Sequence, residues 1–240
     1  DKVVNLITFY AQEVREILAS IGARSIDEII GRADLLTQVS RGHAALDDLD
    51  LNPLLITVDG ASKITYDRSK PRNAVPDTLD AEIIKDGHRF FEDGEKMQLS
   101  YAVRNTLRTI GTRASSHIVK KFGMKNSLQP DHLTVKLSGS CGQSLGAFSV
   151  RGLKIEVQGD ANDYVGKGLS GGTITVRPLM SSPLKAEDNT IIGNTVLYGA
   201  TDGFLFASGR AGERFAVRNS GAKVVVEGCG SNGCEYMTGG

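Results

Sequence analysis

The stretch Gly166-Lys-Gly-Leu-Ser-Gly-Gly-Thr-Ile-Thr-Val176 sets the pattern of this chain, because it joins closely spaced glycines to a short β-forming run. Residues 139–240 repeat this combination and hold 20 of the 28 glycines in the sequence. The runs between the glycines have at most five residues, which is too short for a helix and typical of brief strands between turns. These runs begin at Leu153, Thr173, Thr195, Phe204, Arg214 and Lys223.

The spacing of the runs predicts a repetitive fold. Successive runs start at positions 134, 153, 173, 195 and 214. A regular spacing of this kind is typical of a solenoid whose coils stack on one another. Glycine permits the corners because it adopts positive φ without a Cβ clash. We therefore predict a mainly β fold, a right-handed β-helix or solenoid built from Gly-rich repeats of about twenty residues, preceded by an α-helical N-terminal segment.

Residues 1–37 are predicted to be helical. One apolar stripe recurs at alternating spacings of four and three: Val3, Ile7, Tyr10, Val14, Ile17 and Ile21. It defines a helix from about Val3 to Ser20, ended by Gly22. Ser25-Ile-Asp-Glu28 then has the form of a capping box that opens a short helix. Because an apolar stripe needs a partner, we expect residues 1–37 to pack on a larger body.

Two further segments follow. Residues 38–96 lack sustained periodicity and are predicted to be a connector with short elements, with loop structure at Lys85–Glu95. Three prolines interrupt this connector: Pro53, Pro71 and Pro76. Residues 97–240 are predicted to be the Gly-rich β domain. It opens with an alternating strand at Met97–Val103 and a helix from about Leu107 to Phe122, ended by Gly123.

Composition excludes several classes of partner. Lys and Arg together number 28, as do Asp and Glu, so the overall charge favours neither nucleic acid nor a membrane surface. No apolar stretch approaches the roughly 20 residues of a membrane span. Three cysteines are too few for the disulfide framework of a secreted domain, which favours a reducing cytoplasm.

Both ends of the sequence suggest a piece of a longer polypeptide. The chain opens on Asp1 rather than Met, without a signal peptide. Gly171-Gly172 is followed at once by a β-forming run, whereas the similar Met-Thr-Gly-Gly at residues 237–240 stands where another strand is expected to follow. We therefore expect the β domain to be truncated at its C-terminus.

One glycine motif raises the possibility of nucleotide binding. Gly166-Lys-Gly168-Leu-Ser-Gly171 matches G-x-G-x-x-G, which needs a strand before it and a helix after it so that helix amides meet the pyrophosphate. A β-branched run and then Arg177-Pro178 follow here instead. We interpret these glycines as corners of the chain.

Two of the cysteines are candidate metal ligands. Cys229 and Cys234 flank a Gly-Ser-Asn-Gly loop, a spacing that a metal site could use. Two thiolates fill only half of a tetrahedral site, and no histidine lies nearby in sequence. We interpret both of them, and Cys141 between Gly139 and Gly142, as small buried thiols that fill a narrow interior.

The remaining polar candidates are scattered. His117 follows Ser115-Ser116 on a predicted helix, where adjacent positions point in different directions, so they form no nucleophile–base pair. The other histidines have no carboxylate or cysteine arrangement around them: His43, His88 and His132. Three arginines form a basic strip, which we interpret as a solvated face or an interdomain contact: Arg104, Arg108 and Arg113. The sequence therefore predicts no catalytic, cofactor-binding or metal-binding residue.

Longer motifs match a known family in order along the chain. They are Gly168-Leu-Ser-Gly-Gly-Thr-Ile-Thr-Val176, Ile192-Gly-Asn-Thr-Val-Leu-Tyr-Gly199, Gly209-Arg-Ala-Gly-Glu-Arg-Phe-Ala-Val217 and Val226-Glu-Gly228. They closely resemble the C-terminal GXGXG β-helix region of the glutamate synthase large (alpha) subunit, whose G-x-x-G-x-x-x-G pattern matches Gly139–Gly146. Upstream, Arg24–Leu36 resembles the segment that closes the family's FMN-binding synthase domain, and Arg104–Arg113 resembles the stretch entering its β-helix.

The resemblance implies a function for the parent enzyme. In this family the large subunit releases ammonia from glutamine at an N-terminal cysteine and channels it to a barrel domain, where FMN reduces the imino adduct of 2-oxoglutarate to glutamate. It implies FMN and a 3Fe-4S cluster in the parent. Electrons would come from ferredoxin, or from NADPH through a flavoprotein small subunit carrying FAD and 4Fe-4S clusters.

For this segment the resemblance implies architecture. No residue here matches the family's catalytic or cluster-binding cysteines. Residues 1–37 would be the helical tail of the synthase domain, and the β domain would brace the glutaminase and synthase domains of the same cytoplasmic chain without catalysing a step. Proline at Val225 is expected to break a coil and lower ammonia coupling.

Two alternatives are weighed against this hypothesis. A stand-alone β-helix subunit of another multisubunit oxidoreductase, such as a formylmethanofuran dehydrogenase, would not need the barrel-closing segment Ser25–Leu36. A polysaccharide-cleaving β-helix enzyme would need clustered charges on one face. The acids here are dispersed along the repeat: Asp160, Asp163, Glu187 and Asp188.

Overall fold

The structure, a computed structural model, describes residues 2–57, 69, 73–74, 76–124 and 128–240. The chain forms two compact units, Asp1–Ala74 and Val75–Gly240. Pro71, one of the prolines of the predicted connector, lies outside the described residues. The finer boundaries at residues 37 and 96 remain predictions. Among the described residues, no helix is long and apolar enough to cross a membrane.

The first unit consists of helices and short helical turns. They are α1 (Lys2–Ser20), η1 (Ile26–Glu28), η2 (Ala33–Leu35), α2 (Ala44–Asp47) and η3 (Asn52–Leu54). Helix α1 confirms the predicted first helix, but only Leu18 is buried in it. The predicted short helix after Ser25 is a single 3-10 turn, and the Ser25 side chain makes no capping hydrogen bond. Glu28 Oε2 instead accepts from the N–H of Arg24, the residue before the cap, at 3.0 Å, so the predicted capping box does not form.

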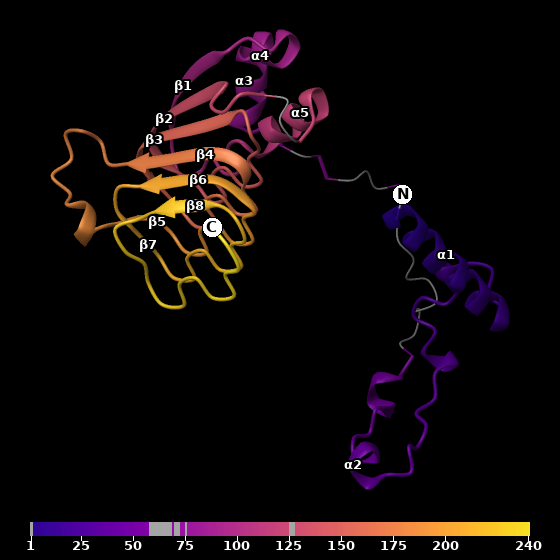
Figure 1. The fold of residues 1–240 in the computed structure, drawn as a ribbon. Coiled ribbons are helices and arrows are strands. Elements are labelled where there is room, and N and C mark those ends of the chain that lie inside the picture. The colour runs from indigo at the N-terminus through magenta and orange to yellow at the C-terminus, as the bar shows by residue number, and fades with distance from the viewer. Residues whose placement is uncertain (1, 58–68, 70–72, 75, 125–127) are drawn as a thin grey trace. The chain divides into compact units, whose positions relative to one another are not determined.

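The second unit combines helices with one sheet (Figure 1). Its helices are α3 (Leu79–Asp86), α4 (His88–Asp93), α5 (Thr112–Phe122) and the 3-10 turn η5 (Ala186–Asp188). Its strands are β1 (Met97–Val103), β2 (Leu133–Cys141), β3 (Leu153–Ala161), β4 (Ser170–Arg177), β5 (Thr190–Ile192), β6 (Asp202–Ala207), β7 (Arg210–Ala211) and β8 (Lys223–Val225). The strand order is β1-β2-β3-β4-β6-β8, with β5 paired to β3 and β7.

The predicted fold class is wrong. The sequence predicted a mainly β right-handed β-helix, whereas the described strands form one eight-stranded sheet whose strand pairs are all parallel, accompanied by helices in an α/β arrangement. The sequence pattern misled because every β-forming run was predicted to be a strand. Much of each repeat is instead built from turns, and segments expected to be loop are helical.

The regular spacing seen in the sequence reappears as the pairing register. Leu133 of β2 lies opposite Leu153 of β3, and Phe204 of β6 lies opposite Lys223 of β8. Between β4 and β6 the register is wider, because Thr173 lies opposite Phe204. The extra length forms an insertion at residues 178–189, which includes η5 and projects from the sheet (Figure 1, orange).

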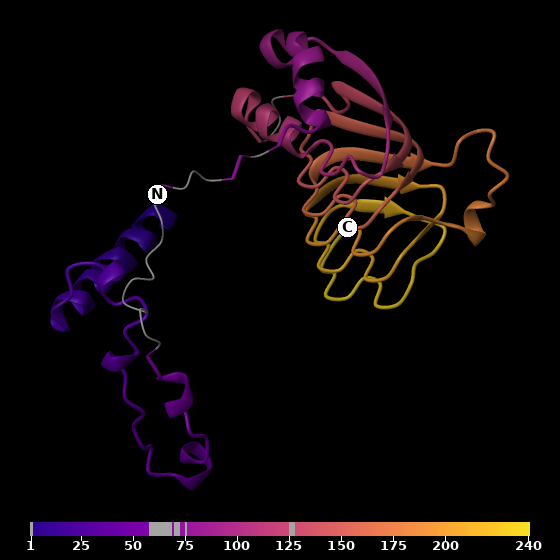
Figure 2. The same cartoon turned by 180° about the vertical axis from the view of Figure 1, so that it is seen from behind.

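Turns with left-handed backbone stack beside the strands (Figure 2). In one repeat, Tyr164, Gly166 and Gly168 each have φ of +63°. The Gly166 N–H donates to the Leu145 carbonyl of the preceding repeat at 2.9 Å, and the Gly168 N–H donates to the Tyr198 carbonyl of the following repeat at 2.9 Å. Alternate amides therefore bond backward and forward along the stack, which satisfies backbone groups that would otherwise be buried without partners.

Two segments predicted as strands belong to these turns. Within Thr195–Tyr198, Thr195 and Leu197 both have φ of +57°, and Arg214–Val217 has the same form. Val196 and Leu197 are adjacent and both fully buried, so these turns do not bury every second side chain as a half-exposed strand does. The prediction failed because a short apolar and β-branched run occurs in a buried turn as well as in a strand.

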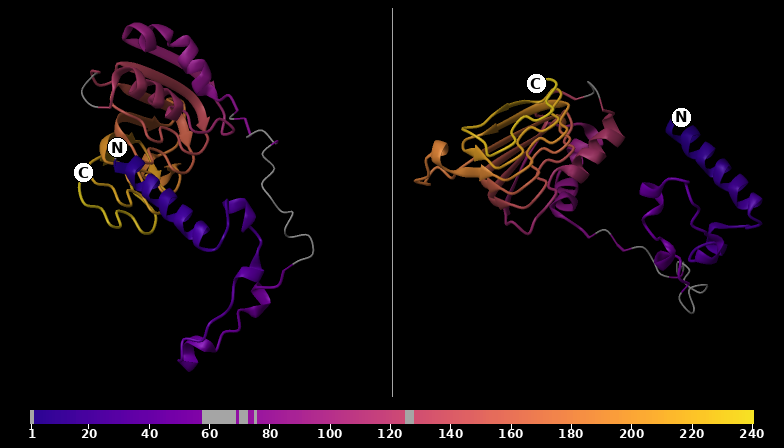
Figure 3. Two further views of the ribbon diagram at one scale, coloured as in Figure 1. Left: turned by 90° about the vertical axis from the view of Figure 1, so that its right-hand side faces the viewer. Right: turned by 90° about the horizontal axis from the view of Figure 1, so that it is seen from below.

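The three α-helices of the second unit lie at the β1 end of the sheet (Figure 3). The prediction of loop at Lys85–Glu95 is wrong, because Ile83 and Phe90 of α3 and α4 are fully buried and draw this polar segment into helices. Phe90 lies 5.6 Å from Phe122 of α5, measured between ring centroids. Helix α5 begins later than predicted, after Gly111, whose φ is +94°. It ends before Gly123 as predicted.

Candidate functional site

The outward face of the sheet carries side chains in rows that cross the strands. The register aligns one row of Ser100, Lys136, Glu156 and Thr175. The next row, two residues further along each strand, contains Ala102, Ser138, Gln158 and Arg177. Neighbouring strands are about 4.8 Å apart, so side chains within a row are neighbours. The alternate residues, such as Leu137 and Val157, are buried beneath them.

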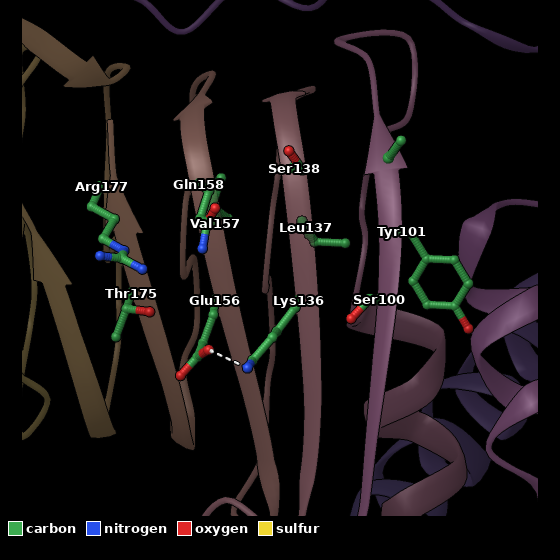
Figure 4. Close-up of a pocket in the computed structure, with 11 residues that line it drawn as sticks. Ser100, Tyr101, Lys136, Leu137, Ser138, Glu156, Val157, Gln158, Thr175 and Arg177 are labelled. Atoms are coloured by element: carbon green, nitrogen blue, oxygen red, sulfur yellow. Dashed lines mark ion pairs between the residues drawn. The ribbon is translucent and has the colours of Figure 1, made fainter. Parts of the chain in front are cut away.

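An open hollow of 610 Å³ lies on this face over β1 to β4 (Figure 4). We call it the outer hollow; the two rows and Tyr101 line it. Its β1 side is lined by the small side chains of Ser100 and Ala102, which leave space that longer side chains on β2 to β4 surround. The hollow therefore results from side-chain size on a continuous sheet.

Charged groups on β3 and β2 neutralise one another in this region. The Glu156 carboxylate lies 2.8 Å from Lys154 Nζ and 3.9 Å from Lys136 Nζ. Lys154 Nζ also lies 3.8 Å from Asp131. The hydrogen bond to Glu156 and the charges of both carboxylates raise the pKa of the Lys154 ammonium, against a smaller effect of burial. Glu156 and the two lysines thus satisfy each other.

Arg177 differs from these lysines. It is exposed at the end of β4, and its Nη1 donates to the Met180 sulfur at 3.4 Å. Thioether sulfur is a weak acceptor. No ion pair joins Arg177 to another of the residues that the structure describes. Its guanidinium therefore offers donors to a group from elsewhere.

A second hollow continues from Arg177 over the C-terminal strands. This aromatic hollow, of 320 Å³, shares Thr175 and Arg177 with the outer hollow and is lined further by Phe206, Val225 and Glu227. The Phe206 ring stacks at 11° on that of Phe204, with 6.2 Å between centroids. Arg177 thus stands between a polar and an apolar depression.

A third hollow continues in the other direction, toward α3. It has a volume of 530 Å³ and shares Tyr101 and Ala102 with the outer hollow. The Tyr101 hydroxyl donates to Asp86 Oδ2 at 3.0 Å. Burial, and secondarily Asp86, raises the pKa of this phenol well above its usual range. Together the three hollows form one band across the sheet from α3 to β8.

The glycines of the nucleotide-like motif do not precede a helix. Gly166, Gly168 and Gly171 all have positive φ, and strand β4 follows. A Cβ on Gly168 would approach the Phe148 ring to 2.6 Å, so this position packs closely against the preceding repeat. The glycines serve the stack of turns, as the sequence predicted for the corners.

The three cysteines divide into two kinds. Cys141 is buried, and burial, with the nearby negative charge of Asp160, raises the pKa of its thiol to about 12. Cys229 and Cys234 are exposed, which contradicts their interpretation as buried interior thiols. The reason is their place on the last turn of the sequence, where no further described turn stacks over them.

Each histidine has a local contact. The His132 ring lies 2.7 Å from the Gly94 carbonyl, and the His88 ring lies 3.3 Å from that of Lys85. His43 accepts a hydrogen bond from the Ala45 N–H at the start of α2. His117 packs edge-on against Phe91, with 6.0 Å between ring centroids. Ser115, beside it on α5, is buried.

The acids and arginines singled out in the sequence are separated. Asp163 accepts from the Asn194 N–H at 2.7 Å, and Asn194 in turn accepts from the Glu213 N–H at 2.8 Å, which forms a ladder between repeats. Asp160 accepts from Ser140 at 2.7 Å. Glu187 and Asp188 lie in η5 of the insertion. Of the three arginines, Arg113 pairs with Asp77 at 3.3 Å, and Arg104 and Arg108 are exposed.

Asp80 is a buried acid that the sequence did not single out. Asp80 is 0% exposed and accepts hydrogen bonds from the N–H groups of Gly111 at 2.7 Å, Arg113 at 2.6 Å and Ala114 at 3.0 Å. It therefore caps the N-terminus of α5 from α3. Burial raises the pKa of the Asp80 carboxyl, opposed by these hydrogen bonds. Local sequence gave no signal, because the partners lie far along the chain, in a different helix.

Neither the described cysteines nor the glycine motif before β4 has the arrangement typical of a redox-cofactor site. An iron–sulfur cluster needs several cysteine thiolates, whereas one of the three cysteines is buried and the other two are exposed on the last turn. No group of three or more His, Cys, Asp or Glu gathers as metal ligands within the described part of the chain. A flavin phosphate favours glycines at a helix N-terminus, and β4 replaces that helix.

Comparisons with known proteins identify close relatives. The family model described as the GXGXG motif matches residues 80–240. The whole chain is 69% identical to part of the "Glutamate synthase [NADPH] large chain" of Azospirillum brasilense and 43% identical to that of Bacillus subtilis. It is 45% identical to part of the "Ferredoxin-dependent glutamate synthase 2" of Synechocystis. The chain spans 16%, 16% and 15% of the length of these three relatives.

Proposed function

Since the chain belongs to the GXGXG motif family and aligns in full with one segment of glutamate synthase large chains, we propose that it is a structural segment of such an enzyme. The parent would make glutamate from glutamine and 2-oxoglutarate. This segment would brace the glutaminase and synthase domains of the same polypeptide, so that ammonia passes between them. The observation that carries the proposal is the 69% identity over all 240 residues.

The stacked architecture supports a bracing role. Each inner strand of the sheet pairs in parallel on both sides, and the turns add a second set of backbone hydrogen bonds between repeats. Tightly packed interiors of this kind resist compression and transmit strain. Relative positions along the stack are therefore fixed by many backbone bonds at once. Such a body suits holding other domains in register.

Helix α1 supports attachment to a larger body. Its apolar stripe is exposed, with Val3 at 72% and Ile7 at 60%. Contiguous exposed apolar surface of this kind marks a contact site. We propose that residues 1–37 are the helical tail of an FMN-binding synthase domain, whose surface covers this stripe.

The cofactors and electron donor of the parent would be bound elsewhere. The Azospirillum relative is named for NADPH and the Synechocystis relative for ferredoxin, yet both contain this segment. We therefore propose that FMN, the iron–sulfur cluster, and the flavoprotein small subunit or ferredoxin meet other parts of the parent. A cytoplasmic location is proposed on the same family resemblance.

Proline at Val225 tests the bracing role in the native polypeptide. Val225 lies opposite Phe206 in the β6–β8 ladder, and proline there removes an N–H from the strand. We expect Val225→Pro to lower glutamine-dependent glutamate synthesis more than ammonia-dependent synthesis. Val225→Thr is the control, because it keeps the branched side chain and the N–H. Equal loss of both activities in the proline variant would show that the segment does not maintain the register.

A further inference from the structure

We infer that Arg177 and the two hollows beside it dock an extended segment from elsewhere in the same large chain. In this contact a carboxylate of that segment pairs with Arg177, and a neighbouring apolar side chain lies on Phe206. The inference deepens the proposed function and rests on it, because the occupant is taken from the rest of that polypeptide.

The outward residues change from polar to apolar between β3 and β8. On β2 and β3 the outward positions are polar or charged, such as Lys136 and Glu156. On β6 they are Phe204 and Phe206, each 43% exposed. Val225 on β8 is 60% exposed beside them. Because the alternate residues already fill the core, these outward aromatic side chains add little to it and mark a contact surface.

The positive charge of Arg177 favours an acidic partner. Lys136 and Lys154 share the Glu156 carboxylate, whereas Arg177 contacts only a weak thioether acceptor at 3.4 Å in the described structure. A guanidinium presents planar, paired donors that match a carboxylate. Charge complementarity at this point therefore favours an Asp or Glu side chain of the occupant.

The size and shape of the hollows fit a polypeptide segment. Sites for small molecules usually enclose about 70 to 90% of the ligand, but the outer hollow (Figure 4) and the aromatic hollow are open depressions on a sheet face. With about 4.8 Å between strands, the six strands from β1 to β8 span about 24 Å. An extended segment of about seven residues covers that distance at about 3.3 Å per residue. The band therefore fits a polypeptide segment.

The length of the relatives favours the same polypeptide as the source of this segment. In the Azospirillum relative the chain accounts for 16% of the length, so most of that polypeptide lies outside this segment. A docked segment of the same chain also needs no second molecule at high concentration. A second copy is the main competitor, because Glu227 lines the aromatic hollow and could reach the Arg177 of another molecule.

Photocrosslinking in the native polypeptide tests the inference. Benzoylphenylalanine replaces Thr175, which lines both hollows, in a mixture of isotopically light and heavy copies of the full protein. We expect crosslinked peptides that join this position to a segment outside residues 1–240, within one copy, next to an Asp or Glu. Crosslinks between light and heavy copies, crosslinks to another protein, or no crosslinked peptide would each overturn the inference.

Charge reversal supplies the matched control. Arg177→Glu should lower the yield of that crosslink at least about tenfold, because a paired charge becomes repulsive. Arg210→Glu reverses an exposed charge on β7 outside both hollows and should leave the yield unchanged. Equal yields in both variants would overturn the role of Arg177. If the full protein makes glutamate from glutamine but no crosslink forms, the docking inference is wrong and the proposed function stands. If the unmodified full protein makes no glutamate from glutamine, the proposed function itself is wrong.

Discussion

Replacing Asp80 with alanine should loosen the N-terminus of helix α5, because the Asp80 side chain caps it. Its carboxylate accepts three backbone N–H groups at 2.6 to 3.0 Å and is 0% exposed. Each buried donor left unpaired costs about 1 to 3 kcal/mol. Because water can enter the space that the carboxylate leaves, we take the lower end for each donor and expect a loss of about 3 kcal/mol.

Hydrogen exchange of peptides that cover Thr112–Phe122 measures this loss. A decrease of about 3 kcal/mol in the free energy of opening speeds exchange about a hundredfold. Asp77→Ala is the matched control, since Asp77 is 86% exposed and pairs with Arg113 of the same helix at 3.3 Å. An exposed pair contributes about 0 to 1 kcal/mol. Similar acceleration in both variants would refute the capping argument.

The pH dependence gives a second check on Asp80. Burial raises the pKa of this carboxyl above its ordinary value, so the folded chain holds the proton more tightly than the unfolded chain does. The resulting stabilisation is fully present below the unfolded pKa of about 3.9 and is lost as pH rises through the folded pKa. The difference in stability between the native protein and Asp80→Ala should therefore narrow as pH rises from about 4. A difference that widens over that window would contradict it.

Three further changes test other parts of the second unit. Gly159→Ala should lower the free energy of unfolding in denaturant by about 3 kcal/mol or more, because φ is +149° and a Cβ would strike the Gly139 carbonyl oxygen. The control is Gly199→Ala, which should lower it by only about 1 kcal/mol, because φ is +63° and nothing lies within 4 Å of a Cβ there. Iodoacetamide at pH 8 should modify the exposed Cys229 and leave Cys141 unmodified until unfolding, because the pKa of the buried Cys141 thiol is raised to about 12. Equal rates of modification of the two cysteines, measured by mass spectrometry, would show that the interior opens readily. Thr195→Gly should not weaken the stack, because φ is already +57° there and glycine tolerates it; a large loss in the midpoint of thermal unfolding would mean that the side chain matters instead.

Local patterns in the sequence predicted individual elements well where one period identifies one backbone. The alternation at Met97–Val103 is strand β1, and the stripe from Val3 is helix α1. The regular spacing of the β-forming runs also reappears in the register of β2 with β3. These features depend on neighbours in sequence, so a single chain is enough to detect them.

The fold class failed where one pattern is compatible with two backbones. Thr195–Tyr198 has the short β-forming composition of a strand but the φ values of a left-handed turn, since non-glycine residues occupy positions where glycine would have been a signal. Helices α3 and α4 form from a polar segment because Phe90 packs against Phe122, which lies in a later helix. Asp80 likewise accepts hydrogen bonds from N–H groups at the start of α5. Contacts across such distances are set by tertiary packing, which local propensity does not contain.

The candidate site was hidden for a related reason, and this bears on function. The outward residues of the sheet look like ordinary solvent-facing positions in sequence, and only the register brings Arg177 beside Phe206 and Val225. The exposed side chains of Phe206 and Val225 add little to the core of the second unit, and the exposed stripe of α1 adds little to that of the first. Exposed apolar surface is unfavourable unless a partner covers it. Two such surfaces, one on each unit, therefore support the proposal that this segment contacts other parts of a longer polypeptide.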